Sequence, residues 1–251
     1  MKRVDGRAAD ELRPVRIETG VQCNPEGSVL FTAGGTRVLI AASVESGVTQ
    51  FLRGSGQGWI TAEYNMHPRA NRERQGREGR RGSLSGRTQE IQRLVGRALR
   101  SCVDLEKLGE RTITIDCDVL DADGGTRTAS ISGGFVALIL ALDGLRKQKL
   151  IEPAAVREAL AAVSVGLVGG EPLLDLCYEE DSRAQVDLNL VSTASSSVVE
   201  VQGTAEGAPM TRAELAKLID LGLEGTSALF ERQLEALRKA GVAMDELIES
   251  R

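Results

Sequence analysis

One segment of the sequence combines the residue types that bind a phosphate group. Gly124-Gly125-Thr126-Arg127 follows a predicted strand and opens a predicted helix. Glycines let backbone N–H groups approach an anion, and the positive end of the helix dipole favours one. Thr126 adds a hydroxyl, and Arg127 adds a guanidinium that can bind two oxygens at once. The segment predicts a phosphate site, with an ordinary strand-to-helix turn as the alternative.

The same tetrapeptide occurs once more, as Gly34-Gly35-Thr36-Arg37. It lies between two predicted strands, where two glycines are typical of a β-hairpin turn, so a structural role is favoured. Arg87 stands near the start of another predicted helix, directly after Ser85-Gly86. A guanidinium beside a helix N-terminus suits a phosphate, and a solvated surface arginine is the alternative.

A pair of aspartates near the middle of the C-terminal half supplies a second kind of chemistry. Asp181 follows Glu179-Glu180 where a predicted strand ends, and Asp187 interrupts the next strand. Two carboxylates on neighbouring strands can share a magnesium ion, which prefers oxygen ligands and keeps some of its waters. A solvated acidic hairpin rim is the alternative.

A basic stretch precedes Arg87, the first of the predicted phosphate contacts, and extends into its helix. The window from Arg69 to Arg100 holds ten arginines against three glutamates, a net charge of +7, whereas the whole chain has a net charge of −5. Such a surface contacts a nucleic-acid backbone, and without interleaved aromatics it positions the strand rather than reads its bases. A solvated loop is the alternative. The arginines concerned are Arg69, Arg72, Arg74, Arg77, Arg80 and Arg81.

The rest of the composition excludes several classes of protein. The chain has a single histidine, His67, and four cysteines without a CxxC pair, which argues against HExxH zinc sites and most nucleophilic triads. The longest apolar run, residues 135–142, is far shorter than a membrane span. We expect a soluble cytoplasmic protein without a membrane segment.

Hydrophobic periodicity indicates the elements that position these groups. Period-2 and period-3.6 patterns alternate in an order typical of an α+β fold with mixed α/β layers. No linker separates two independent units, so we expect one domain over 1–251, with sub-blocks at about 10–145 and 155–225. Strands are expected at 15–19, 28–33, 36–43, 59–64, 111–120, 161–168, 172–178, 185–191 and 198–202, and helices from about 87, over 128–147 and over about 211–240.

Six segments, in order along nearly the whole chain, resemble the ribonuclease PH family of phosphorolytic exoribonucleases. A more distant resemblance is to polynucleotide phosphorylase and the exosome ring subunits. The segments are GQGWITAEY at 56–64, GRTQEIQRL at 86–94, DCDVL at 116–120, ADGGTRTAS at 122–130, YEEDS at 178–182 and VEVQGT at 199–204.

The resemblance implies a fold like the second domain of ribosomal protein S5 and a homohexameric ring built as a trimer of dimers. Inorganic phosphate would bind Arg87, Gly125, Thr126 and Arg127. Asp181 and Asp187 would be the catalytic or Mg²⁺-binding pair. The arginines of the 69–81 run would hold the body of tRNA.

The implied function is a phosphorolytic 3′-to-5′ exoribonuclease, a tRNA nucleotidyltransferase. It would trim tRNA precursors and other RNA 3′ ends and release nucleoside diphosphates reversibly. A catalytically silent RNA-binding ring subunit is the alternative, disfavoured because the arginines, Thr126 and both aspartates are present. A hydrolytic metal nuclease is a third possibility, but it would give the phosphate sites no purpose.

Overall fold

The computed structural model describes residues 3–248, without the side chains of Arg80 and Arg81. The strands are β1 (Val15–Thr19), β2 (Gly27–Ala33), β3 (Thr36–Ser46), β4 (Trp59–Met66), β5 (Arg111–Asp121), β6 (Leu160–Val168), β7 (Glu171–Leu174), β8 (Val186–Thr193) and β9 (Val198–Ala205). The helices are α1 (Gly86–Ser101), α2 (Leu105–Leu108), α3 (Thr126–Lys147), α4 (Tyr178–Asp181), α5 (Arg212–Lys239) and α6 (Met244–Leu247), with 3₁₀ turns at Gln50–Leu52 and Glu78–Arg81.

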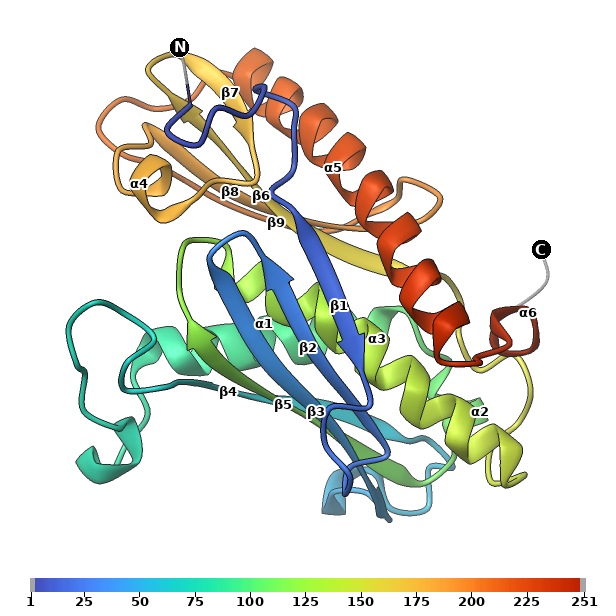
Figure 1. Ribbon diagram of the computed structural model, residues 1–251. Coiled ribbons are helices and arrows are strands. Elements are labelled where there is room, and N and C mark those ends of the chain that lie inside the picture. The colour runs from blue at the N-terminus through green and yellow to red at the C-terminus, as the bar shows by residue number, and fades with distance from the viewer. Residues whose placement is uncertain (1–2, 249–251) are drawn as a thin grey trace.

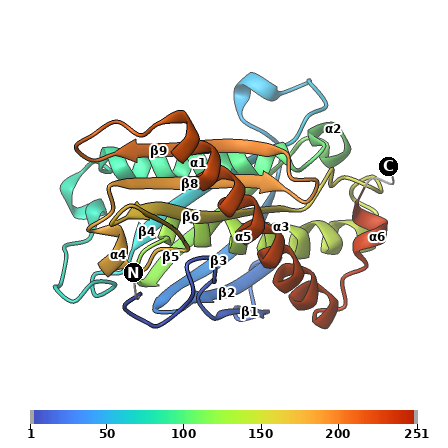
Figure 2. The same ribbon diagram turned by 90° about the horizontal axis from the view of Figure 1, so that it is seen from above.

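The elements form two sheets with helices between and beside them (Figure 1). The first sheet has the order β1-β2-β3-β5-β4, in which only β4 and β5 pair in parallel. The second sheet is antiparallel, with the order β7-β6-β8-β9. Helices α1 and α3 lie between the sheets, and α5 runs along the other side of the second sheet (Figure 2). The predicted mixed α/β architecture is confirmed.

Helix α3 is buried on nearly all sides because it lies between two sheets. Residues from Thr128 to Ile139 are all buried, including Ile131, Phe135 and Leu138. Within residues 3–248, α3 alone is long and apolar enough to cross a membrane. However, 89% of its apolar stretch is buried inside the protein. A helix that is apolar all round and enclosed in this way is the core helix of the fold.

Helices α1 and α5 each begin directly after a residue whose side chain caps the helix N-terminus. Ser85 precedes α1, and its hydroxyl accepts a hydrogen bond from the Thr88 N–H at 3.2 Å. Thr211 precedes α5 in a capping box, in which its hydroxyl and the Glu214 carboxylate each accept from the other residue's N–H. Such caps satisfy N–H groups that have no partner within the helix. Both caps therefore place the helix start within a residue or two of the predicted position.

The expected strand over 172–178 is wrong in its second half. Strand β7 ends at Leu174, and residues 178–181 form the helical turn α4 instead. Asp175 has a φ angle of +53°, which breaks the extended chain. Its carboxylate accepts hydrogen bonds from the backbone and side chain of Arg13, a partner far away in sequence. Local periodicity could not reveal this tertiary contact.

Candidate active site

The glycine pair before α3 has a conformation that favours glycine. Gly124 and Gly125 have φ angles of +76° and +64°, which L side chains rarely adopt. A Cβ added at Gly124 would lie 2.5 Å from the carbonyl oxygen of Leu176, so the loop packs directly against the chain that leads into α4. The first N–H groups of α3 follow immediately. They have no partner within the helix and can bind an anion.

A tyrosine from the first sheet holds Thr126 in place. Tyr64 on β4 is buried, and its hydroxyl forms a hydrogen bond of 2.8 Å with the Thr126 hydroxyl. Burial raises the pKa of Tyr64, although the Thr126 hydrogen bond and the charge of Arg87 oppose the change. The charge of Arg127 also opposes it. Both predicted phosphate-binding arginines therefore lie near this pair of hydroxyls.

The two predicted carboxylates are within electrostatic range of the same two arginines, and Asp187 is within range of Asp181. Burial, together with the negative charge of Asp181, raises the pKa of Asp187 to about 6, while Arg127 and Arg87 act against the rise. Burial also raises the pKa of Asp181, again opposed by the two arginines. The four charged side chains come from α1, α3, α4 and β8. Asp181 ends α4 rather than a strand, so the expected pair of neighbouring strands is wrong, although the convergence of the two aspartates is found.

Arg127 is held by Gln202, which is in turn bound to Glu90, and the sequence pattern predicts no role for either residue. Its Nη1 donates a hydrogen bond of 2.7 Å to Oε1 of Gln202 on β9. The Gln202 amide nitrogen in turn donates to a carboxylate oxygen of Glu90 on α1. Arg87 lies one turn before Glu90 and is exposed at the start of the same helix. Only the packing of β9 beside α1 brings these side chains together.

The carboxylate pair fits a magnesium ion that takes its other ligands from elsewhere. Within residues 3–248, no three His, Cys, Asp or Glu side chains gather into a metal site. Magnesium is usually held by one or two carboxylates, with waters and substrate phosphates completing the shell. A shared cation would also offset the repulsion by which Asp181 raises the pKa of Asp187. The donors present therefore suit magnesium bound together with a phosphate substrate.

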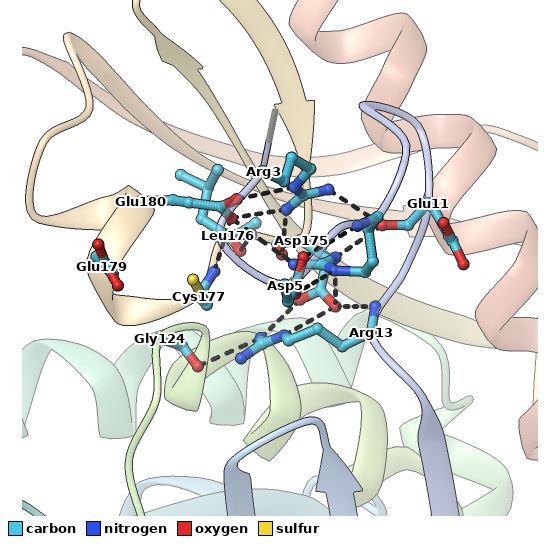
Figure 3. Close-up of polar contacts among 12 residues, drawn as sticks. Arg3, Asp5, Glu11, Arg13, Gly124, Asp175, Leu176, Cys177, Glu179 and Glu180 are labelled. Carbon is cyan, nitrogen blue, oxygen red and sulfur yellow. Dashed lines mark hydrogen bonds and ion pairs between the residues drawn. The ribbon is translucent and has the colours of Figure 1, made fainter. Parts of the chain in front are cut away.

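The N-terminal segment, residues 3–14, is joined to α4 by a buried ion pair (Figure 3). The Arg3 guanidinium donates to both carboxylate oxygens of Glu180, at 2.8 and 2.7 Å, and both side chains are buried. Burial opposes ionisation, but the Arg3 hydrogen bond keeps the pKa of Glu180 below its ordinary value. Glu180 also accepts from the Cys177 N–H at 3.2 Å, which closes the turn. Because Asp181 follows Glu180, this ion pair fixes the turn that carries the carboxylate.

A second arginine of the N-terminal segment joins it to the glycine loop. Nη2 of Arg13 lies 2.7 Å from an Asp175 carboxylate oxygen and 3.4 Å from the carbonyl oxygen of Gly124. Its Nη1 donates to the carbonyl oxygen of Asp123. Arg13 therefore links the glycine loop to Asp175, in the segment that leads into α4 (Figure 3). Neither Arg3 nor Arg13 belongs to a recognisable motif, and their importance is visible only from their burial.

The basic run lies in the loop between β4 and α1, which extends away from the sheets (Figure 1). Arg69, Arg72, Arg74 and Arg77 are exposed. The side chains of Arg80 and Arg81 lie outside the part that the structure describes. None of the four described arginines contributes to the pKa changes of the aspartate pair. The loop is thus a solvated surface next to the site rather than part of the charged cluster.

Comparison with known protein families accounts for most of the chain. Residues 11–142 match domain 1 of the 3′ exoribonuclease family, and residues 158–225 match domain 2. Ribonuclease PH of Exiguobacterium sibiricum is 55% identical over 235 residues, which cover 94% of each chain. Ribonuclease PH of Bacillus velezensis is 56% identical over 236 residues, which cover 94% of this chain and 96% of that relative.

Solved structures agree with this fold. A structure titled as the Archaeoglobus fulgidus exosome with RNA bound to the active site has a TM-score of 0.75 and 26% identity, covering 92% of each chain. Rice (Oryza sativa) Rrp46 has a TM-score of 0.76 at 19% identity, covering 94% of this chain and 100% of that one, which supports the fold alone. With both family domains matched and more than half of the residues shared with full-length relatives, the chain belongs to the 3′ exoribonuclease family.

Proposed function

We propose that this chain is a phosphate-dependent tRNA nucleotidyltransferase that trims the 3′ ends of tRNA precursors by phosphorolysis. Membership of the 3′ exoribonuclease family and the relatives named ribonuclease PH support this activity. The observation that carries the proposal is the convergence of two arginines and two aspartates beside the glycine loop. A silent RNA-binding subunit, the alternative, needs neither the arginine pair nor the aspartate pair.

In the proposed reaction, an oxygen of inorganic phosphate attacks the phosphorus of the terminal phosphodiester. A new P–O bond forms while the bond from phosphorus to the preceding 3′ oxygen breaks, and that oxygen takes the proton of the incoming hydrogen phosphate. The products are a nucleoside diphosphate and an RNA one nucleotide shorter. Because one P–O bond replaces another, excess diphosphate reverses the reaction. Phosphate is already ionised at neutral pH, so no histidine base is required.

The main task of the protein is to bring two anions together. Arg87 and Arg127 offset the charge of the incoming phosphate, which also takes hydrogen bonds from the Gly125 backbone and the Thr126 hydroxyl. Fixed donors of this kind need no reorganisation during the reaction. Asp181 and Asp187 would hold Mg²⁺, which supplies positive charge for the phosphodiester oxygens.

The remaining parts of the proposal concern RNA, assembly and location. The exposed loop arginines, together with Arg80 and Arg81, hold the tRNA body through its phosphates. The chains assemble into a ring, a homohexamer built as a trimer of dimers, which is supported by the similarity in fold to exosome subunits. The enzyme works in the cytoplasm.

Product analysis tests the reaction directly. An RNA with a short 3′ extension is incubated with the protein and Mg²⁺, with phosphate or with sulfate at the same ionic strength. We expect nucleoside diphosphates only where phosphate is present. Monophosphates without phosphate would mean a hydrolase. No nucleotide in either buffer would mean the silent ring subunit.

A matched pair of variants tests the carboxylate assignment. Asp187→Asn keeps the size of the side chain but removes its charge, and should abolish diphosphate release. Asp245→Asn makes the same change at an exposed position of helix α6 and should leave the activity unchanged. Full activity in Asp187→Asn would contradict the assignment of the aspartate pair.

A further inference from the structure

Gln202 connects the predicted phosphate-binding arginine to a carboxylate on another element. Its Oε1 accepts a 2.7 Å hydrogen bond from Nη1 of Arg127, and its Nε2 donates to Glu90. The three residues come from β9, α3 and α1. Gln202 is half-buried, so solvent competes only partly for its amide. The amide therefore joins strand β9 of the second sheet to helices α1 and α3.

The chemistry of the two partners fixes the orientation of the amide. A guanidinium can only donate hydrogen bonds, so the amide oxygen must face Arg127. An ionised carboxylate can only accept them, so the NH₂ group must face Glu90. Flipping the amide would break both contacts. Both polar ends of the Gln202 amide are consequently engaged, and the amide oxygen restrains Nη1 of Arg127.

The neutrality of Gln202 distinguishes it from an ordinary ion-pair partner. A carboxylate at this position would pair with Arg127 directly and compete with a bound anion for the guanidinium. A neutral amide restrains the same group while leaving its full positive charge available. That charge acts against the rise in the pKa of both Asp181 and Asp187, so the guanidinium lies near the aspartate pair.

We propose that Gln202 is a positioning residue for the phosphate site, which orients Arg127 without neutralising it while Glu90 anchors the amide. This inference rests on the proposed function, in which Arg127 binds inorganic phosphate. Gln202 acts through Arg127 and does not itself touch the substrate. The property that it controls is therefore the affinity for phosphate, rather than the affinity for RNA.

The same strand and helix provide a matched control. Glu200, two residues before Gln202 on β9, accepts a hydrogen bond of 2.8 Å from Nε of Arg97 on α1. This contact also joins β9 to α1, but it involves neither of the predicted phosphate-binding arginines. Glu200→Gln thus weakens the strand-to-helix contact without altering the partner of Arg127. This variant therefore distinguishes the effect of a weaker contact between β9 and α1 from the effect of a misplaced Arg127 guanidinium.

The experiment measures kcat and the KM values for phosphate and RNA in the full-length enzyme with Mg²⁺. Gln202→Leu removes the charge-assisted hydrogen bond, and Gln202→Glu adds a competing carboxylate. Both should raise the KM for phosphate roughly tenfold or more, with Gln202→Glu the more affected. The KM for RNA should change less than twofold. Glu200→Gln should match the parent enzyme in all three constants.

Reference variants distinguish failure of this inference from failure of the proposed function. Arg127→Lys should raise the KM for phosphate by itself. If it does so and the Gln202 variants do not, the positioning role is wrong while the phosphate site stands. If Arg127→Lys also leaves this KM unchanged, the phosphate assignment and the positioning role both fail. Equal losses in the Gln202 variants and Glu200→Gln, with lower melting temperatures, would also overturn the positioning role.

Discussion

The tetrapeptide Gly-Gly-Thr-Arg occurs twice in this chain, and the two copies have different roles. The copy at 34–37 turns the hairpin between β2 and β3, as the sequence predicts. The copy at 124–127 leads from β5 into α3, beside the aspartate pair. The residues are identical, but a strand follows the first copy and a helix follows the second. The element that comes next, rather than the motif, decides which copy has free N–H groups for an anion.

The first copy also supports the second. The Thr36 hydroxyl donates to the Gly124 carbonyl oxygen at 2.7 Å and accepts from the Asp123 N–H at 2.9 Å. Arg37 pairs with Asp121 at 3.2 Å. The hairpin turn thus supports the glycine loop before α3, and its own arginine forms an ion pair. Arg127, in contrast, is held by the neutral Gln202.

Replacing the arginine in each copy should give the largest contrast. Arg127→Ala removes a donor for the incoming phosphate and should lower kcat/KM for phosphate by about 10²–10³-fold. Arg37→Ala removes an ion pair that is about half exposed, so it should cost less than about 1 kcal/mol of stability and leave this ratio within about twofold. Steady-state kinetics at several phosphate concentrations provide the measurement. Equal losses in the two variants would remove the functional distinction between the copies.

A side chain in the second glycine pair should be costly to stability. Gly124→Ala forces a residue into positive φ and places its Cβ against the Leu176 carbonyl, so we expect a loss of about 2–5 kcal/mol. Gly170 has a similar φ of +82° but open space around it. Gly170→Ala should therefore cost only about 1–2 kcal/mol. Urea unfolding measures the stability of both variants. Similar losses of stability would contradict the close packing of the glycine loop before α3.

Removing the Thr36 hydroxyl should weaken the support from the first copy. Thr36→Val leaves the Gly124 carbonyl and Asp123 N–H without this partner, and should cost about 1–3 kcal/mol of stability. The KM for phosphate should rise a few-fold because the loop loses a restraint. Thr32→Val, on the neighbouring strand β2, is the isosteric control and should change stability by less than about 0.5 kcal/mol. An unchanged KM for phosphate in Thr36→Val would mean that the hairpin does not influence the glycine loop before α3.

The smallest effect concerns the carboxylates beside the second copy. The pKa of Asp187 is raised to about 6, mainly by burial, above its value near 3.9 in an unfolded chain. The folded state therefore binds more protons between these values, and the contribution of Asp187 to stability falls as the pH rises through that range. In metal-free buffer, Asp187→Asn should raise the melting temperature relative to the parent more at pH 7.5 than at pH 4.5. A difference that is the same at both pH values would contradict the raised pKa.

Elements that rest on local signals were predictable from the sequence. Strand β1 and helix α5 have the predicted bounds to within a residue or two. The alternating pattern of a strand and the capping residues of an amphipathic helix mark where each element begins and ends in the local sequence. The glycine loop before α3 was predictable for the same reason. The convergence of Arg87 and Arg127 with the aspartates followed from the family resemblance, not from periodicity.

Features that depend on distant partners were not predictable. The turn α4 is too short for a periodic pattern, and its Glu180 is held by Arg3 from the other end of the chain. Gln202 appears on the sequence as one polar residue of an alternating strand. Its two partners are 75 and 112 residues away, and no local pattern records such a pairing.

The contact between Arg3 and Glu180 also sets an order of events during synthesis of the chain. Arg3 leaves the ribosome first, and its partner is made 177 residues later. At 5–20 residues per second this interval is roughly 10–35 s. The first sheet and α3 can form during that time, but the turn bearing Asp181 gains its N-terminal partner only when α4 has emerged. A prematurely terminated chain that ends before α4 therefore carries the arginines of the site without its carboxylates.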